Sequence, residues 1–303
     1  MLIEQGGTIG FDPKLGWTSE EIKAGRELHL AEALMKFVDP QGNLSAFSRQ
    51  VGDGALPIIV SNHDHHANVA GMRGVVKRMA FRPDHFNFIV ALTMFNGDQG
   101  KSIQKSSIGM MKTLDQSGMR FVPVLRPKDI KQYYRRKKTL GETKKDIEDS
   151  QGRVAKVFEE INGDTGLILF PEGTVQGGRK GEDGRRFGMQ EVTNDLLPTY
   201  IQEVLQRGRT PLLLPVGMVN TNSIVEVGSV KPTTKAALAL ASQMALGRLG
   251  VRPTVAQVRI GQPFGVREIE LEGIDLEDKG SVNTYIARKI ANLLPQDARG
   301  FYR

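Results

Sequence analysis

The chain has 303 residues, of which 39% are hydrophobic and 25% charged, a composition typical of a globular protein and not of a disordered one. It contains no cysteine, which excludes disulfides, cysteine–zinc sites and thiolate nucleophiles. The net charge of +7 favours an anionic ligand, an acidic protein partner or an anionic membrane surface, and on its own it also fits nucleic acid.

No segment predicts insertion into a membrane. The first residues lack a charged region followed by an apolar core, so we expect no signal peptide. The longest apolar run, Pro211–Val219, is far shorter than the roughly 18–20 residues that a spanning helix needs. We therefore expect a cytoplasmic protein, with peripheral association as the one kind of membrane contact left open.

The order of the predicted elements indicates the fold class. Thr18 and Glu21 form a capping-box pattern that predicts a helix from there to about residue 38. Strands and helices then alternate. Strands are expected over residues 56–60, 86–94, 121–125, 166–170, 212–216 and 255–260, and helices over 68–79, 101–116, 153–161, 194–206, 235–249 and 282–294.

This alternation predicts an α/β fold with a mostly parallel central sheet flanked by helices on both faces. We expect residues 1–50 to form a short N-terminal helical extension and residues 51–303 to form one α/β domain.

The first stretch with chemical potential is IIVSNHDHHANVAG, residues 58–71. It predicts a buried strand followed by a polar turn, the place where open α/β sheets bind ligands. His63 in this turn is a candidate general base, because an imidazole titrates near pH ~6.5. Asn68, five residues on, is a candidate to orient the ring, although an amide supplies no negative charge. The alternative for His63 is a surface histidine in a polar turn.

Asp64, His65 and His66 in the same turn suggest a metal-dependent phosphoesterase as another interpretation. Consecutive residues do not all face one ion from regular structure, and the sequence shows no distant partner cluster or further aspartate pattern upstream. We therefore predict no metal site. The phosphoesterase alternative predicts stoichiometric bound metal.

The second stretch is GLILFPEGTVQGG, residues 166–178, another apolar strand that ends in a polar, glycine-rich turn. Glu172 lies 109 residues after His63 (172 − 63), so only the fold can bring the two turns together. The alternative for Glu172 and Thr174 is a strand-end turn that caps a helix.

Together the two turns, NHDHHAN and FPEGTVQ, resemble the phospholipid/glycerol acyltransferase family, which has N-H-x-x-x-x-D after its first strand and F-P-E-G-T-R-S after a later one. The resemblance extends from about residue 56 to 263. Supporting matches follow in order: Arg126 closing FVPVLR, Phe187-Gly188, the proline-bearing strand at 211–216, and Val258–Pro263.

The chain departs from the family pattern in three places. Asn68 stands where the family has an aspartate. Val175 and Gln176 replace the arginine and serine after FPEGT, a loss that Arg179 or Lys180 is a candidate to offset. The segment between Arg126 and Glu172 is long and strongly basic.

The resemblance implies acyl transfer to glycerol-3-phosphate or a lysophospholipid such as 1-acylglycerol-3-phosphate. His63 and Asn68 would form the catalytic pair, and His63 would take the proton of the acceptor hydroxyl. Arg126, Glu172, Gly173 and Thr174 would hold the acceptor. No cofactor is implied; acyl-CoA or acyl carrier protein would be the co-substrate, and the sequence leaves the choice of donor and acceptor open.

Two further alternatives concern function and partners. Because Asn68 replaces the expected acid, a catalytically degenerate lipid- or carrier-binding homologue is the second hypothesis. The basic residues between 131 and 145 are either a solvated helix face or a contact for an anionic membrane, CoA phosphates or an acidic carrier. Interleaved acids such as Glu142 and Asp146 argue against nucleic acid, which we do not expect as a partner.

Overall fold

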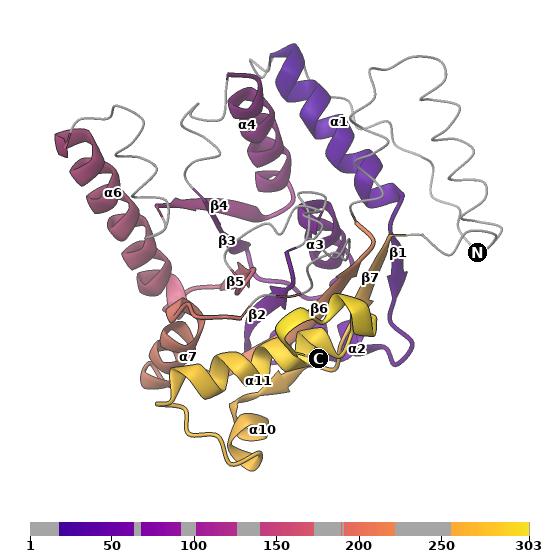
Figure 1. Ribbon diagram of the computed structural model, residues 1–303, viewed down its shortest axis with the longest axis vertical. Helices are drawn as coiled ribbons and strands as arrows, with labels where there is room; N and C mark the ends of the chain where they lie inside the picture. The colour runs from indigo at the N-terminus through magenta and orange to yellow at the C-terminus, as the bar shows by residue number, and fades with distance from the viewer. Residues whose placement is uncertain are drawn as a thin grey trace.

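A computed structural model of the protein describes residues 18–63, 68–91, 101–125, 140–172, 189, 191–221 and 256–302. These residues form an open eight-stranded sheet with helices on both faces (Figure 1). The strands are β1 Lys36–Val38, β2 Leu56–Ser61, β3 His85–Ala91, β4 Met119–Val124, β5 Thr165–Leu169, β6 Pro211–Val219, β7 Gln257–Ile260 and β8 Phe264–Gly265. The helices are α1 Ser19–Ala33, α2 Asn43–Gly52, α3 Asn68–Lys77, α4 Lys101–Asp115, α6 Leu140–Glu159, α7 Leu196–Gln206, α10 Val266–Leu271 and α11 Lys279–Ala291, with short 3-10 turns at η3 Glu160–Asn162, η4 Gln296–Ala298 and η5 Gly300–Tyr302.

The strand order is β1-β7-β6-β2-β5-β3-β4, and β8 also pairs with β6. The pairs β6–β2, β2–β5, β5–β3 and β3–β4 are all parallel, while β7 and β8 run antiparallel to β6. The predicted α/β class, with a mostly parallel sheet covered on both faces, is confirmed. The carboxyl ends of β6, β2, β5, β3 and β4 therefore lie along one edge of the sheet.

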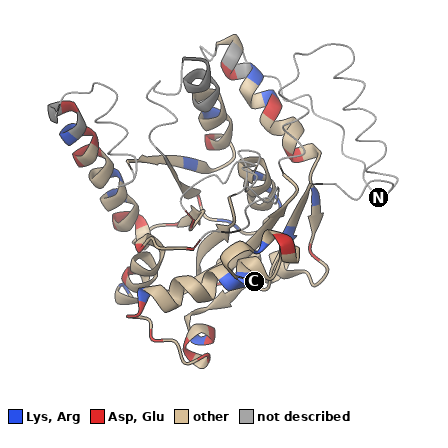
Figure 2. Cartoon of the chain, in the orientation of Figure 1, with Lys and Arg blue, Asp and Glu red and all other residues tan. Residues whose placement is uncertain are grey.

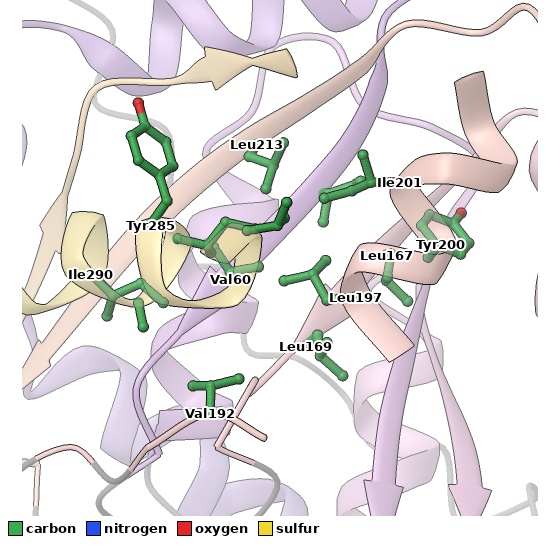
Figure 3. Packing of buried hydrophobic residues seen from close by; sticks show 14 of the residues in the cluster. Val60, Leu167, Leu169, Val192, Leu197, Tyr200, Ile201, Leu213, Tyr285 and Ile290 are labelled. Carbon is green, nitrogen blue, oxygen red and sulfur yellow. The ribbon is translucent and has the colours of Figure 1, made fainter. Parts of the chain in front are cut away.

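The alternation of side chains along each strand divides the core into two clusters. On β2, Ile59 belongs to one cluster, together with residues of α1, α2, α3 and α4. Ile58 and Val60 belong to the other, which α6, α7, α10 and α11 cover. Figure 3 shows part of this second cluster, with Tyr200 and Leu197 of α7 beside strand residues of the sheet. All six residues of β2 are buried, as expected for a central parallel strand.

The N-terminal region differs from the prediction in its second half. The capping box at Thr18 and Glu21 is present, but α1 ends at Ala33, so the expected helix to residue 38 is too long. Residues 36–38 instead form β1, because they pair with β7 more than two hundred residues away. Asp39 then accepts hydrogen bonds from the backbone of Asn43 and Leu44 at the start of α2. The residues assigned to a helical extension thus add a strand to the sheet.

Several contacts attach α1 to α3 and α4, and two of them are buried or close enough to restrict the packing. Arg73 of α3 is almost fully buried and donates to Glu32 and also to Ser117 just after α4, so it joins three segments. Gly109 of α4 lies directly against the backbone of Glu21 on α1: a Cβ built there would be 2.5 Å from the Glu21 Cα. The absence of a side chain at this position permits the close crossing of the two helices.

The described helices show neither a membrane span nor a purely basic surface. Within the described ranges, no helix combines the length and the apolar character needed to cross a bilayer. Acidic and basic residues are interspersed along α6, as the red and blue segments in Figure 2 show, and Lys144 pairs with Glu148 one turn later at 3.8 Å. Lys144 and Lys145 belong to this mixed surface. The rest of the basic segment, residues 131–139, and the predicted helix at 235–249 lie outside the described residues.

The glycine contacts allow a matched stability test. Gly109→Ala would force α1 and α4 apart and should lower the free energy of unfolding by about 1–3 kcal/mol, because the obstructing atoms are backbone. Gly152→Ala in α6 meets nothing within 4 Å and should raise stability by about 0.5–1 kcal/mol through helix propensity. Chemical denaturation of the two variants checks this. Equal shifts in the same direction would contradict the close crossing.

Candidate functional site

The two predicted turns meet at the carboxyl edge of the sheet. β2 and β5 are parallel neighbours, with Val60 opposite Leu169. His63 follows the end of β2 and Glu172 follows the end of β5, so both residues lie in turns at the same edge of the sheet. The backbone N–H of His63 donates a long hydrogen bond of 3.4 Å to Glu172 Oε1. The fold therefore brings together two residues 109 positions apart in the chain.

The imidazole of His63 is stacked on an aromatic ring. The ring centroids of His63 and Phe170 are 4.1 Å apart and their planes differ by 3°. Phe170 is itself buried and packs edge-on against Phe88 of β3, with a centroid distance of 5.4 Å. Because Phe170 directly follows β5 and belongs to the core cluster, one face of the imidazole rests on a rigid support.

Asn62, immediately before His63, attaches the turn to β6. Its Nδ2 donates to the carbonyl of Met218 at 3.0 Å, and its Oδ1 accepts from the N–H of Met218 at 2.7 Å. The side chain thus pairs with both backbone groups of one residue, as a neighbouring strand would. Since Asn62 is 4% exposed, these two bonds are shielded from water and fix the start of the turn.

Asn68, the first residue of α3, is completely buried and hydrogen-bonded at both ends of its amide. Its Nδ2 donates to the backbone carbonyl of Asn62 at 2.9 Å, and its Oδ1 accepts from the hydroxyl of Thr221 at 2.6 Å. The sequence hypothesis had the Asn68 carbonyl orient the His63 ring. In the structure, Asn68 binds the peptide group that precedes His63, and its own side-chain carbonyl accepts the hydrogen bond from Thr221.

Thr221 and its neighbour Asn220 were missed at the sequence level. Both follow β6, at the same edge as the two motif turns, and Thr221 is fully buried. Asn220 has a φ of 57°, in the left-handed region that asparagine tolerates better than most residues. The available signal was the polar pair Asn-Thr directly after the long apolar strand, the same pattern that identified His63.

The carboxylate of Glu172 influences a tyrosine from the C-terminus. Glu172 is 9% exposed. Burial raises the pKa of Tyr302, and the negative charges of Glu191 and Glu172 raise it further, against the opposing effects of the Val192 hydrogen bond and Arg288. The hydroxyl of Tyr302 accepts a hydrogen bond of 2.8 Å from the backbone of Val192. The charge of Glu172 is therefore felt at Tyr302, which is itself bound to the backbone of Val192.

Several predicted residues lie outside the described part of the chain. These are Arg126, Gly173, Thr174, Arg179 and Lys180 of the expected acceptor site, and the Asp64-His65-His66 triplet of the metal interpretation. Among the residues that the structure does describe, no group of three or more histidines, aspartates or glutamates is arranged to hold a metal ion.

Comparison with models of known protein families and with curated proteins finds no match to this chain. The site is therefore defined by its own geometry: His63 between a buried asparagine anchor and a stacked phenylalanine, with a carboxylate across the strand pair.

The stack on Phe170 is testable without any assumption about activity. Phe170→Leu should move the ring-proton resonances of His63 downfield, because the ring current of the stacked phenylalanine is removed, and should cost about 1–1.5 kcal/mol of stability. NMR of histidine-labelled protein, with His63 assigned by substitution, measures the shift.

Phe264→Leu is the matched control, because Phe264 is equally buried but packs against Tyr285 in the other core cluster. It should reduce stability and leave the His63 resonances in place. Resonances unmoved by Phe170→Leu would show that the two rings are not stacked in solution.

Proposed function

We propose that this protein is an O-acyltransferase that moves a fatty acyl group from acyl-CoA or acyl carrier protein to a hydroxyl of glycerol-3-phosphate or 1-acylglycerol-3-phosphate. The observation that carries the proposal is the contact between the two motif turns: the ring of His63 stacks on Phe170, and the backbone N–H of His63 donates to Glu172. The acyltransferase resemblance requires these turns to share one site.

In the proposed reaction His63 acts as general base. Its imidazole takes the proton of the acceptor hydroxyl while the hydroxyl oxygen attacks the thioester carbonyl. The resulting tetrahedral intermediate collapses with cleavage of the carbon–sulfur bond. The imidazolium returns its proton to the leaving thiolate, so that the products are an ester and a free thiol and the histidine is neutral again.

Glu172 supports this chemistry electrostatically. Its carboxylate is buried at the His63 turn, so a negative charge lies close to where the imidazolium forms. A nearby opposite charge favours the protonated ring, and burial strengthens the interaction. Asn68 cannot supply such a charge. In the proposal, Glu172 also binds an acceptor hydroxyl.

The proposed phosphate site comes from the resemblance and the chemistry of the residue types. Arg126 binds phosphate as a planar bidentate donor. Gly173 lets backbone amides approach an anion, with Thr174 beside it. Arg179 or Lys180 would replace the arginine missing after FPEGT. Donor and acceptor headgroups are all anionic, which agrees with the net charge of +7.

The second candidate is a lipid- or carrier-binding protein on the same scaffold, without catalysis. One observation favours it: the buried residue at the expected acid position is the neutral Asn68, and its carbonyl accepts from Thr221. This candidate predicts binding of acyl carrier or lysophospholipid with no turnover.

The activity test crosses two donors, acyl-CoA and acyl carrier protein, with glycerol-3-phosphate and 1-acylglycerol-3-phosphate, with and without anionic vesicles. We expect wild-type turnover with at least one pair, and a fall in kcat of roughly 10²–10⁴-fold for His63→Ala, the usual contribution of a general base.

His85→Ala is the matched control. His85 begins β3, at the opposite end of the strands, where it pairs with Glu160 at 3.5 Å, so its loss should leave turnover unchanged. Equal rates for wild type and His63→Ala would remove His63 as the base. Stoichiometric bound metal in elemental analysis, with hydrolysis of phosphate esters, would favour the phosphoesterase alternative instead.

A further inference from the structure

One of the positions at which this chain departs from the acyltransferase pattern is Asn68, and its surroundings match an amide. One end of the side chain faces an acceptor, the Asn62 carbonyl at 2.9 Å, so the nitrogen must lie there. The other end faces a hydroxyl, Thr221 Oγ1 at 2.6 Å, so the oxygen accepts there. Asn68 is fully buried, and water is not available to replace either partner.

An ionised aspartate does not fit this arrangement. A carboxylate has no donor, so one of its oxygens would be placed against the Asn62 carbonyl oxygen, and two acceptors at hydrogen-bond distance repel each other. The burial of an unpaired charge would add to the cost. The residue type at position 68 and the hydroxyl at position 221 are therefore complementary to each other and to the turn.

We propose that Asn68 and Thr221 are a positioning pair that holds the peptide group before His63 and thereby keeps the imidazole against Phe170. An acid at position 68 would be expected to act on the imidazole directly. This pair instead acts on the backbone that carries the imidazole. Its effect on catalysis rests on the acyl-transfer proposal, whereas its effect on the turn does not.

The pair belongs to a set of contacts between three segments, in which the Asn62 carbonyl also accepts from the Ser61 hydroxyl at 3.2 Å. The side chain of Asn62 binds both backbone groups of Met218, and the backbone carbonyl of Asn62 accepts from Asn68. Asn68 in turn binds Thr221, three residues beyond Met218 on the same segment. The left-handed conformation of Asn220 directs the chain between them. The turn before His63 is thus bound directly to β6 at Met218 and, through Asn68, to Thr221 just after β6.

The first part of the test measures the turn itself. We expect faster amide hydrogen exchange over residues 61–63, and altered His63 ring resonances, in Thr221→Val and Asn68→Asp. Thr221→Ser retains the hydroxyl and should restore most of the wild-type exchange. Thr221→Val is nearly isosteric and leaves Asn68 in place, so it decides the question even if Asn68→Asp fails to fold.

Thr165→Val is the matched control. Thr165 is a buried threonine whose hydroxyl donates to the Glu160 carbonyl at 3.0 Å, at the opposite end of β5. Its substitution should lower stability without changing exchange at residues 61–63 or the His63 resonances.

The second part separates positioning from stability through kinetics. In Thr221→Val and Asn68→Asp, kcat should fall about ten-fold or more, because the imidazole is misplaced, while KM changes by less than about two-fold. Thr165→Val should leave kcat unchanged. Asn68→Asp turnover equal to or above wild type, or unchanged exchange in Thr221→Val, would overturn the positioning pair.

The two proposals fail separately. If wild type transfers no acyl group from either donor, the proposed function fails, and the exchange and NMR measurements still decide whether Asn68 and Thr221 hold the turn. If wild type is active and Thr221→Val matches it in kcat and in exchange, the function stands and the positioning pair is wrong.

Discussion

The parallel pairing of β2 with β5 on one side and β6 on the other determines the geometry of the site. All six residues of β2 are buried, so its register on both neighbours is fixed by two-sided packing. A slip of one residue would move His63 away from Glu172 and turn the ring to the opposite face of the sheet. The apolar packing within the strands therefore determines where the turns that follow them lie, and with them the contacts of His63, Asn62 and Glu172.

The site differs in kind from one built on a charged dyad. The buried groups around the turn, namely two asparagines, a threonine and a backbone peptide, are neutral, and each is matched donor to acceptor. Neutral networks avoid the desolvation cost of a buried charge, but they depend on complete satisfaction, since one missing partner leaves another group unpaired. The negative charge at this corner comes from Glu172 on the neighbouring strand end.

The sequence allowed the prediction of the α/β class and of the two motif turns, because periodicity and strand-end polarity are local. The resemblance, and not the residue pattern alone, led us to expect His63 and Glu172 in one site. The sequence did not lead us to β1, which exists only through its pairing with β7. Nor did it indicate the partners of Asn68: Thr221 lies 153 residues away, and only the register of β6 on β2 brings it there.

The helix that carries Asn68 is packed against the same strand that carries its partner. Gly71 of α3 faces the side chain of Met218, and a Cβ at that position would lie 2.8 Å from the Met218 sulfur. Met218 therefore contacts α3 through its side chain and Asn62 through its backbone. Arg73 ties the same helix to Glu32 of α1 and to Ser117 just after α4, so α3 is also attached to its neighbours on the outer side. A displacement of α3 would be transmitted to the His63 turn through Met218 as well as through Asn68. The close approach at Gly71 and the amide at position 68 therefore both hold α3 in one position relative to that turn.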